Sequence, residues 1–165
     1  MSRTKAVYAG SFDPIHFGHL DIIKRASQIF DLDVIVGNNS AKQYLLPIEQ
    51  RTHLVRQMVA ASGSEGRQLI DVHSMHVGLL ANLAKHLGAR VIVKGIRGFA
   101  DYDYERMLHE ISVSQVAEIE TVLIPGSPAF QHISSSAIKE LWKLDGDLKQ
   151  YTSQEVVYAL KALRR

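Results

Sequence analysis

Short apolar segments alternate with longer segments of helical periodicity along most of the chain, and this alternation restricts its fold more than any other feature. The apolar runs that indicate strands are residues 6–9, 34–36, 69–72, 91–93 and 121–124. Helical spacing of apolar residues predicts helices over residues 18–30, 47–62, 79–87, 102–116, 135–144 and 153–164. Strands and helices that alternate through short connections build βαβ units. The sequence therefore predicts an α/β, doubly wound domain with a five-stranded parallel sheet and helices on both faces.

The composition fits one globular domain. Of the 165 residues, 46% are hydrophobic and 22% charged, and a chain of this size buries roughly two thirds of its unfolded surface, enough for one core. Cysteine is absent, which excludes disulfides, thiolate metal ligands and a cysteine nucleophile. No apolar run reaches about 18 residues and no leader-like segment opens the chain, so we expect a cytoplasmic protein with no membrane partner. The net charge of +2 is too small to indicate nucleic-acid binding.

The first loop after a predicted strand, residues 10–19, is the first candidate site. Ligands of parallel sheets bind at the carboxyl ends of strands, which here lead into residues 10–19, 37–46, 73–78, 94–101 and 125–136. The first loop carries neither G-x-G-x-x-G nor a P-loop. Gly10 allows a ligand to approach the backbone, and Gly18 opens a helix whose free N–H groups attract anions. His16 and His19 lie on one side of the first turn, where an imidazole donates to phosphate oxygens.

Two other interpretations of the histidine pair stay open. The pair is equally explained as an ordinary polar cap of the helix that follows. Zinc binding also fits the spacing of His16 and His19, although the sequence shows neither an evident third ligand nor an H-E-x-x-H motif.

The turn after the fourth predicted strand carries two cations, Lys94 and Arg97, on either side of Gly95. An isolated pair of this kind usually lies on the solvated surface and binds nothing. On the same edge as His19, it indicates a phosphate clamp in which Arg97 supplies a planar fork and Lys94 a compact charge.

Two further segments have both a structural and a functional interpretation. The serines at 134–136 open a helix, where they either only cap it or also hold a triphosphate. Asp101 and Asp103 are interpreted as an acidic helix start that the helix dipole favours, rather than as metal ligands.

The motifs occur in the order and approximate spacing of one enzyme family. They are Ala9-Gly10-Ser11-Phe12-Asp13-Pro14, Gly18-His19, Lys42, Lys94-Gly95-Ile96-Arg97, Asp101-Tyr102-Asp103-Tyr104-Glu105 and Ile133-Ser134-Ser135-Ser136. Together they resemble the pantetheine-phosphate adenylyltransferases (phosphopantetheine adenylyltransferases) of the nucleotidylyltransferase superfamily. The resemblance runs from residue 7 to about residue 140, and it implies a single Rossmann-like nucleotidylyltransferase domain over residues 1–165.

The resemblance also implies an activity. It implies reversible transfer of the adenylyl group of ATP to 4′-phosphopantetheine, which gives dephospho-coenzyme A and pyrophosphate in coenzyme A biosynthesis. The transfer would be a direct in-line attack with no covalent intermediate. Mg²⁺ would be held by phosphate and water rather than by protein side chains. A homohexamer and feedback inhibition by coenzyme A follow from the same resemblance.

By the same resemblance, residues receive roles. His19 stabilises the transition state and Lys42 acts beside it. Binding of phosphopantetheine falls to Ser11, Lys42, Leu80 and Lys94. Binding of ATP falls to Ser11, Phe12, His19, Gly95, Ile96, Arg97, Glu105, Phe130, Gln131, His132, Ile133, Ser134, Ser135 and Ser136. The chain departs from the commonest family pattern at Ser11 and His16, where threonine is usual, at Lys94, where arginine is frequent, and at Phe130, where a larger aromatic residue is usual.

Rival functions remain at this stage. One is another adenylyl- or cytidylyltransferase, such as one acting on nicotinate mononucleotide, which Lys42 and the motif of residues 101–105 disfavour. Another is a non-catalytic nucleotide-binding or regulatory protein on the same fold. The first would release pyrophosphate with a different acceptor, and the second with none.

Overall fold

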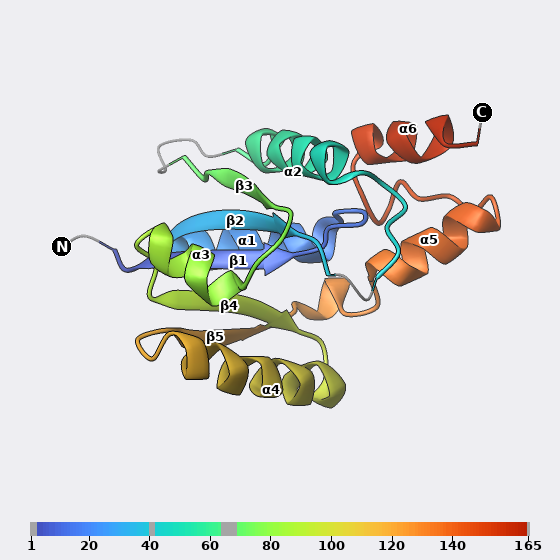
Figure 1. Ribbon diagram of the computed structural model, residues 1–165. Coiled ribbons are helices and arrows are strands. Elements are labelled where there is room, and N and C mark those ends of the chain that lie inside the picture. The colour runs from blue at the N-terminus through green and yellow to red at the C-terminus, as the bar shows by residue number, and fades with distance from the viewer. Residues whose placement is uncertain (1–2, 40–41, 64–68, 165) are drawn as a thin grey trace.

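The sheet consists of five parallel strands, and the strand order changes direction near its middle. The computed structural model describes residues 3–39, 42–63 and 69–164. The strands are β1 (Lys5–Gly10), β2 (Asp31–Gly37), β3 (Val72–Met75), β4 (Val91–Ile96) and β5 (Glu120–Pro125). They pair in the order β3-β2-β1-β4-β5 (Figure 1). The reversal falls between β1 and β4, and the loops that leave two such strands diverge and make room for a ligand.

Helices cover both faces of the sheet, as the doubly wound prediction requires. They are α1 (Phe17–Ile29), α2 (Ile48–Ala61), α3 (Leu80–His86), α4 (Phe99–Gln115), α5 (Ser135–Lys143) and α6 (Gln154–Ala162), with a 3₁₀ turn η1 (Pro128–Phe130). Figure 1 shows α3 in front of the sheet and α1 behind it. Among the described helices, none has both the length and the apolar character needed to cross a membrane.

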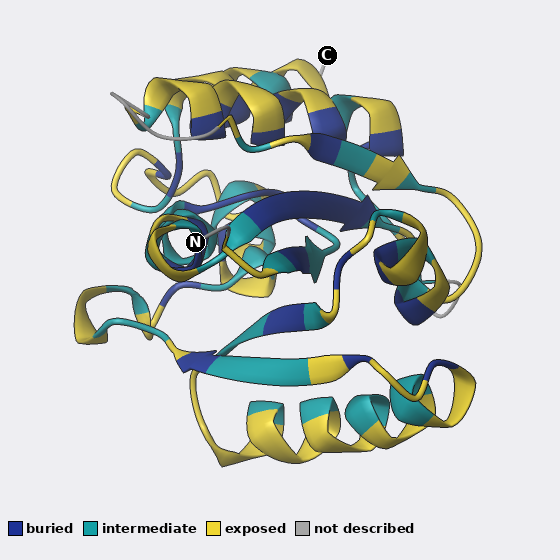
Figure 2. Ribbon diagram, turned by 90° about the vertical axis from the view of Figure 1, so that its left-hand side faces the viewer, coloured by how far each residue is buried: buried dark blue, intermediate teal, exposed yellow. Residues whose placement is uncertain are grey.

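The two faces of the sheet have separate cores because strand side chains alternate between them. The larger core includes Tyr8 and Val34 from the strands and residues of α1, α2, α5 and α6. The smaller core joins Val7 and Ile35 to the alanines of α3. Figure 2 shows that buried residues are concentrated in the strands and on the inward sides of the helices. The α/β fold with five parallel strands is thus confirmed.

Four predicted boundaries are wrong by three residues. β2 begins at Asp31 instead of residue 34. β4 continues to Ile96 instead of ending at residue 93, so Lys94 and Gly95 lie in the strand and not in the turn after it.

The third strand was predicted at residues 69–72, but β3 begins only at Val72, and Leu69 is 84% exposed. β3 is an edge strand whose position is set by pairing with β2, from Val34–Val72 to Gly37–Met75, and only its first residue, Val72, is buried. Apolar content therefore does not mark it. α4 begins at Phe99 instead of residue 102, and the Asp101 carboxylate accepts the Arg97 backbone N–H there, at 2.9 Å.

The C-terminal segment is tied to the loop that follows β1. The Thr152 hydroxyl donates to the Ile15 carbonyl at 2.7 Å, and the Phe17 N–H donates to the Tyr151 carbonyl at 3.0 Å. Inside the segment, the Trp142 indole N–H donates to the Leu160 carbonyl and joins α5 to α6. These bonds fix α5 beside the carboxyl ends of the strands, toward which the arrowheads point in Figure 1.

Candidate active site

A cleft of about 290 Å³ opens at the carboxyl ends of β1 and β4, where the strand order reverses. Most of the predicted site residues line it: His19, Lys42, Lys94, Gly95, Ile96, Arg97, Glu105, Phe130, Ile133, Ser134, Ser135 and Ser136. They come from the carboxyl end of β4, from the first turns of α1, α4 and α5, and from the loops after β2, β4 and β5. The side chains of His19, Lys42 and Arg97 therefore line one cavity. The proposed phosphate chemistry depends on this arrangement.

The loop after β1 is built around a buried aromatic ring. A side chain at Gly10 would come within 3.0 Å of the Phe12 ring, so the ring needs a glycine there. Phe12 itself has a φ of 48° and is 1% exposed, and its ring lies edge-on to His19 at 4.9 Å between centroids. The Phe12 side chain is thus a support for His19, and its predicted contact with ATP is left to its backbone.

His16 and His19 have different tasks in this loop. His16 is the N-cap of α1, and its Nδ1 accepts the His19 backbone N–H at 3.2 Å. The two rings are stacked at 3.6 Å. Nδ1 of His19 is buried and has no hydrogen-bond partner in the described part of the chain, which leaves Nε2 to face the cleft. The capping interpretation is correct for His16.

Both histidines are neutral near pH 7. Burial, followed by the positive charge of Arg97, lowers the pKa of His16 to about 3. Burial, followed by the charges of His16 and Arg97, lowers the pKa of His19 well below its usual value. Because Nδ1 of His16 accepts a backbone N–H, its ring proton is on Nε2. The loop therefore offers hydrogen-bond donors to an anion without bringing a formal charge.

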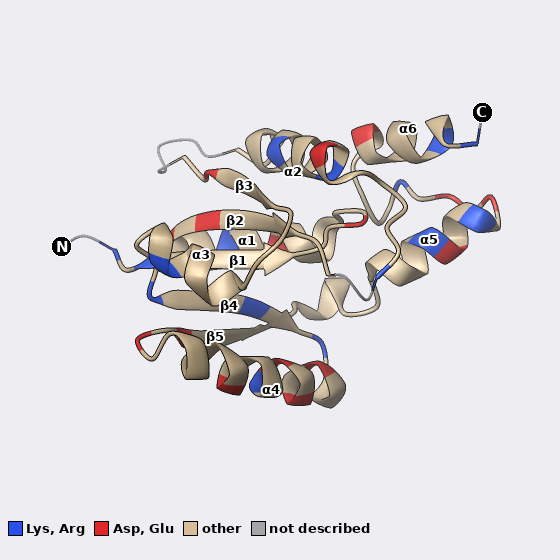
Figure 3. Ribbon diagram, in the orientation of Figure 1, with Lys and Arg blue, Asp and Glu red and all other residues tan. Residues whose placement is uncertain are grey.

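Another part of the cleft wall carries two cations, Lys94 in β4 and Arg97 just after it, and each contacts a carboxylate of α4. Lys94 Nζ lies 3.0 Å from Glu105 Oε2, and Arg97 Nε lies 3.1 Å from Asp101 Oδ2. Figure 3 shows basic residues at the end of β4 beside acidic residues at the start of α4. Burial by itself would raise the pKa of Asp101, but the hydrogen bonds and charge of Arg97 hold that pKa below its usual value. These cations are thus already paired before any phosphate arrives.

The N-terminus of α5 forms a third wall. The Ser134 hydroxyl accepts the Ala137 N–H as the N-cap, and the Ser135 hydroxyl donates to the Pro14 carbonyl at 2.9 Å. Ser136 is exposed and lines the cleft. Capping explains Ser134, and the contact with Pro14 places the free N–H groups of α5 next to the loop after β1.

Lys42 reaches the cleft from the loop after β2. It is exposed and forms no ion pair within the described residues. Its ammonium is therefore available to a ligand, in contrast to those of Lys94 and Arg97.

Several predicted site residues lie outside the cleft lining. The Ser11 carbonyl accepts a hydrogen bond from Arg51 at 2.6 Å, and Leu80 packs against the smaller core. Gln131 is exposed and donates to the Gly126 carbonyl. The His132 ring lies 6.1 Å from that of Tyr151. Ser11, Leu80, Gln131 and His132 are thus not among the residues that line the cleft, and their predicted roles stay predictions.

Sequence reasoning missed Tyr8, Ile22 and Tyr104, which also line the cleft. Tyr8 is 5% exposed, and its hydroxyl has no hydrogen-bond partner among the described residues. Burial, reinforced by the charge of Glu105, raises the pKa of Tyr8 above its usual value, so the phenol keeps its proton. Strand alternation could have predicted the position of Tyr8, because side chains two residues apart, such as those of residues 8 and 10, point to the same face of the sheet.

The described residues contain no group of three or more His, Cys, Asp or Glu arranged to hold a metal ion. The carboxylates that line the cleft, Asp101 and Glu105, both contact cations of β4.

Comparison with known proteins identifies close relatives. The Cytidylyltransferase-like family matches residues 7–141. The phosphopantetheine adenylyltransferase of Thermotoga neapolitana is 42% identical over 156 residues, which are 94% of this chain and 93% of the relative. That of Actinobacillus pleuropneumoniae serotype 3 is 40% identical over 163 residues, 98% of each chain. The Plasmodium falciparum nicotinic acid mononucleotide adenylyltransferase, solved in complex with NaAD, has a TM-score of 0.65 over 97% of this chain and 96% of its own, and at 16% identity it shows the fold alone.

Proposed function

Because the chain belongs to the phosphopantetheine adenylyltransferase family, we propose that it transfers the adenylyl group of ATP to 4′-phosphopantetheine, giving dephospho-coenzyme A and pyrophosphate. The observation that carries this proposal is the single cleft in which His19, Lys42 and Arg97 meet. The reaction belongs to coenzyme A biosynthesis and is reversible, because a phosphoanhydride is made as another is broken.

The chemistry fits these residues because no general base is needed. The attacking group is a phosphate monoester with a second pKa near 6, so it is mostly dianionic at pH 7. Its oxygen forms a bond to the α-phosphorus of ATP in line with the departing oxygen, and the bond to pyrophosphate breaks. The main barrier is the approach of two anions, and catalysis consists of positioning and charge stabilisation.

We assign the acceptor phosphate to the side of the cleft formed by β1 and β2. Lys42 supplies the available ammonium there, and Lys94 lies across the cleft from it. Ser11 contributes from the rim, and Leu80 lies beside the path of the pantetheine arm. His19 donates a hydrogen bond from Nε2 to the α-phosphate, where negative charge accumulates in the transition state.

We assign the triphosphate to β4 and α5. Arg97 and the free N–H groups at Ser134–Ser136 face the same cleft and would hold the departing pyrophosphate. Phe130 and Ile133 give this wall its apolar surface. Asp101 already accepts from Nε and Nη2 of Arg97, so the carboxylate competes with a phosphate for the guanidinium when ATP binds.

We propose Mg²⁺ as the cofactor, carried into the cleft on the triphosphate. Both carboxylates of the cleft wall are already in contact with cations, so phosphate oxygens and water are the ligands that fit this cleft. When bound, the ion offsets the charge of the triphosphate.

The experiment that tests the proposal is a panel of acceptors. The purified protein is mixed with Mg²⁺-ATP and, separately, with 4′-phosphopantetheine, nicotinate mononucleotide and no acceptor, and pyrophosphate is measured. We expect pyrophosphate only with phosphopantetheine. Release with nicotinate mononucleotide would assign the chain to another adenylyltransferase activity, and ATP binding without release in any arm would make it a binding protein.

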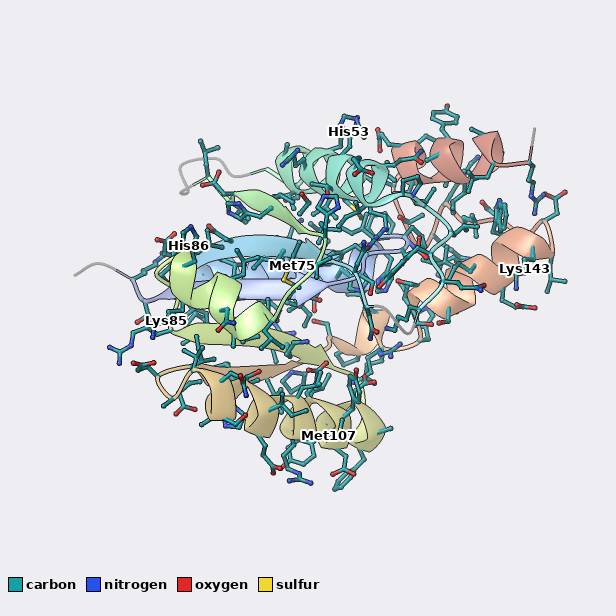
Figure 4. The ribbon with its side chains drawn as sticks, viewed as in Figure 1. His53, Met75, Lys85, His86, Met107 and Lys143 are labelled. Carbon is teal, nitrogen blue, oxygen red and sulfur yellow. The ribbon has the colours of Figure 1, made fainter. Side chains whose placement is uncertain are left out.

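We also propose that the chain forms a homo-oligomer, a hexamer in line with its family. The support is α4, which has no buried residue and presents Tyr104, Met107 and Ile111 at 48%, 45% and 48% exposure. These residues fall on one side of the helix at spacings of three and four, the pattern of a helix–helix contact. Figure 4 shows Met107 on the outer side of α4. Light scattering of the wild type and of Met107→Glu would test this, with a smaller assembly expected for the variant.

The remaining proposals concern control and location. Coenzyme A contains the same phosphopantetheine arm as the proposed product, so we propose that it competes for the cleft and inhibits the reaction. The dependence of the rate on coenzyme A at fixed phosphopantetheine tests this competition. We propose a cytoplasmic location, where ATP is supplied, which fractionation of the source cells tests.

A further inference from the structure

Arg51 is a cation buried in the first turn of α2, where the charges of Asp13 and Glu49 act on it but no carboxylate among the described residues accepts a hydrogen bond from it. It is 1% exposed. Its Nε donates to the Leu46 carbonyl at 3.0 Å, and its Nη1 donates to the carbonyls of Ser11 and Gly37 at 2.6 and 3.1 Å. Its Nη2 donates to the side-chain oxygen of Asn38. The guanidinium also lies over the Tyr44 ring, 4.1 Å from its centre.

These partners come from three separate segments, and cleft-lining residues lie close to them in the chain, Gly10 before Ser11 and Lys42 between Asn38 and Tyr44. Ser11 follows β1, Gly37 and Asn38 end β2, and Tyr44 and Leu46 lead into α2. Lys42 lies between Asn38 and Tyr44, so Arg51 holds the chain on both sides of it. One planar group with donors in fixed directions therefore sets the relative position of the Ser11 peptide and of Lys42.

Asp13 binds the same turn into α2 through the turn's backbone N–H groups. Its carboxylate accepts the N–H groups of Leu45 and Leu46 at 2.9 and 3.0 Å, while Arg51 takes the Leu46 carbonyl. Lys139 of α5 contacts Asp13 at 3.2 Å. In the turn that leads into α2, the backbone N–H groups are thus bound by Asp13 and the Leu46 carbonyl is bound by Arg51.

A role in folding alone does not account for a charge at this position. Taking a guanidinium out of water costs several kcal/mol, and an apolar side chain of similar volume often serves stability as well or better. Here the cation contacts carbonyl and amide oxygens, and no carboxylate among the described residues hydrogen-bonds to it. The directional donors are what an apolar residue would lose, and three of their four acceptors belong to Ser11, Gly37 and Asn38, next to Gly10 of the cleft lining or just before Lys42.

We propose that Arg51 is the positioning residue for the acceptor phosphate: it fixes the Ser11 peptide and the segment carrying Lys42 so that both meet the phosphate of phosphopantetheine. The inference rests on the proposed function. ATP binding depends much less on Arg51, because Arg97 and the α5 N-terminus are carried by other elements.

The test compares the two Michaelis constants in steady-state pyrophosphate release. Arg51→Lys keeps the charge but cannot reach all four oxygens, and Arg51→Met removes charge and donors at similar volume. A misplacement of about 1 Å can cost about 100-fold, so we expect the KM for phosphopantetheine to rise about 10- to 100-fold, and the KM for ATP by less than about threefold. The larger rise belongs to Arg51→Met.

The matched control is Arg56, an exposed residue on the same helix. Its Nη2 donates to the Val72 carbonyl of β3 at 2.7 Å, away from the cleft, so Arg56→Lys and Arg56→Met also remove an arginine–carbonyl bond of α2. We expect them to change stability without separating the two KM values. Unfolding curves of every variant distinguish lost stability from lost positioning.

A second variant keeps the test decisive if Arg51→Met does not fold. Asn38 is exposed, so Asn38→Ala loosens one of the anchored segments and leaves the cation in place. The same selective rise in the KM for phosphopantetheine is expected, at smaller size. Equal rises in both KM values, or lower stability with both KM values unchanged, would overturn the inference. Absence of pyrophosphate from the wild type itself would instead overturn the proposed function.

Discussion

On the β4 side of the cleft, Lys94 and Arg97 are charged and each contacts a carboxylate. On the β1 side both histidines are neutral, His16 being buried and His19 half-buried. Phosphates that arrive on the β4 side must compete with Glu105 and Asp101. Phosphates on the β1 side meet hydrogen-bond donors that carry no charge and have no anionic partner to lose. A phosphate on the β4 side thus replaces a carboxylate as the partner of a cation, whereas a phosphate on the β1 side accepts hydrogen bonds from neutral imidazoles.

The two sides of the cleft attract phosphate in different ways, one through charged side chains and the other through neutral hydrogen-bond donors. The exposed Arg97–Asp101 pair responds to salt and contributes little, whereas the Lys94–Glu105 pair, whose side chains are 16% and 15% exposed, is screened less. A buried donor aimed at the reacting group costs nothing to reorganise when charge develops, and this makes it the larger contributor to rate. The β1 wall should therefore dominate kcat, and the β4 wall should mainly set the KM for ATP.

The largest expected effect is on the β1 wall. His19→Ala removes the donor that faces the α-phosphate, and loss of one preorganised donor typically costs about 3–4 kcal/mol, or about 10²- to 10³-fold in kcat. The fold should survive, because the helix cap is supplied by His16 and not by His19. Steady-state kinetics and an unfolding curve check both statements. Near-normal turnover would remove His19 from the mechanism and with it the contrast between the walls.

The neutrality of the β1 wall predicts a loss of stability in acid. His16 has a folded pKa of about 3 against about 6.5 in the unfolded chain, so below pH 6.5 the unfolded state binds the extra proton. Stability from this residue is complete above pH 6.5 and declines as the pH falls, by about 2 kcal/mol at pH 5.

His16→Thr keeps an N-cap acceptor for the His19 N–H but removes the titrating group. Its loss of stability between pH 7 and pH 5 should be about 2 kcal/mol smaller than that of the wild type. Denaturant unfolding at the two pH values measures this difference. His53→Thr is the control, because His53 is exposed on the outer side of α2 (Figure 4) and lies outside the loop. An unchanged pH dependence in His16→Thr would show that the buried imidazole is not what acid attacks.

The sequence predicts which loops form the cleft better than it predicts the contacts within it. The glycine loop, Lys94 and Arg97 follow predicted parallel strands, and strand order alone brings such loops to one edge. The partners of Lys94 and Arg97 depend on how α4 returns across β4, which residue type and spacing do not specify. Arginine is usually exposed, so nothing in the sequence predicted that Arg51 is buried. β3 was misplaced because only Val72 of this edge strand is buried, so no apolar run marks it.

Tyr8 offers a smaller test of the β1 wall. Its protonated hydroxyl lies at the cleft and has no partner among the described residues, so Tyr8→Phe removes a donor without leaving a buried group unsatisfied. A hydrogen bond to a substrate is typically worth about 1 kcal/mol, so kcat/KM should fall about fivefold while stability stays within about 0.5 kcal/mol. Kinetics and thermal unfolding of the variant measure both. A drop in stability with full activity would make the hydroxyl structural.

The smallest effect, and the one of opposite sign, belongs to the β4 wall. Asp101→Asn keeps an acceptor for the Arg97 N–H but removes the charge that competes with ATP for the guanidinium. An exposed ion pair contributes about 0.2–1 kcal/mol, so the KM for ATP should fall by up to about fivefold at low salt and converge on the wild-type value as salt rises. Glu110→Gln, which breaks the Arg106–Glu110 pair of the same spacing on α4, should leave that KM unchanged. If the KM for ATP rises instead, the carboxylate aligns the guanidinium, and the β4 wall is preorganised for phosphate just as the β1 wall is.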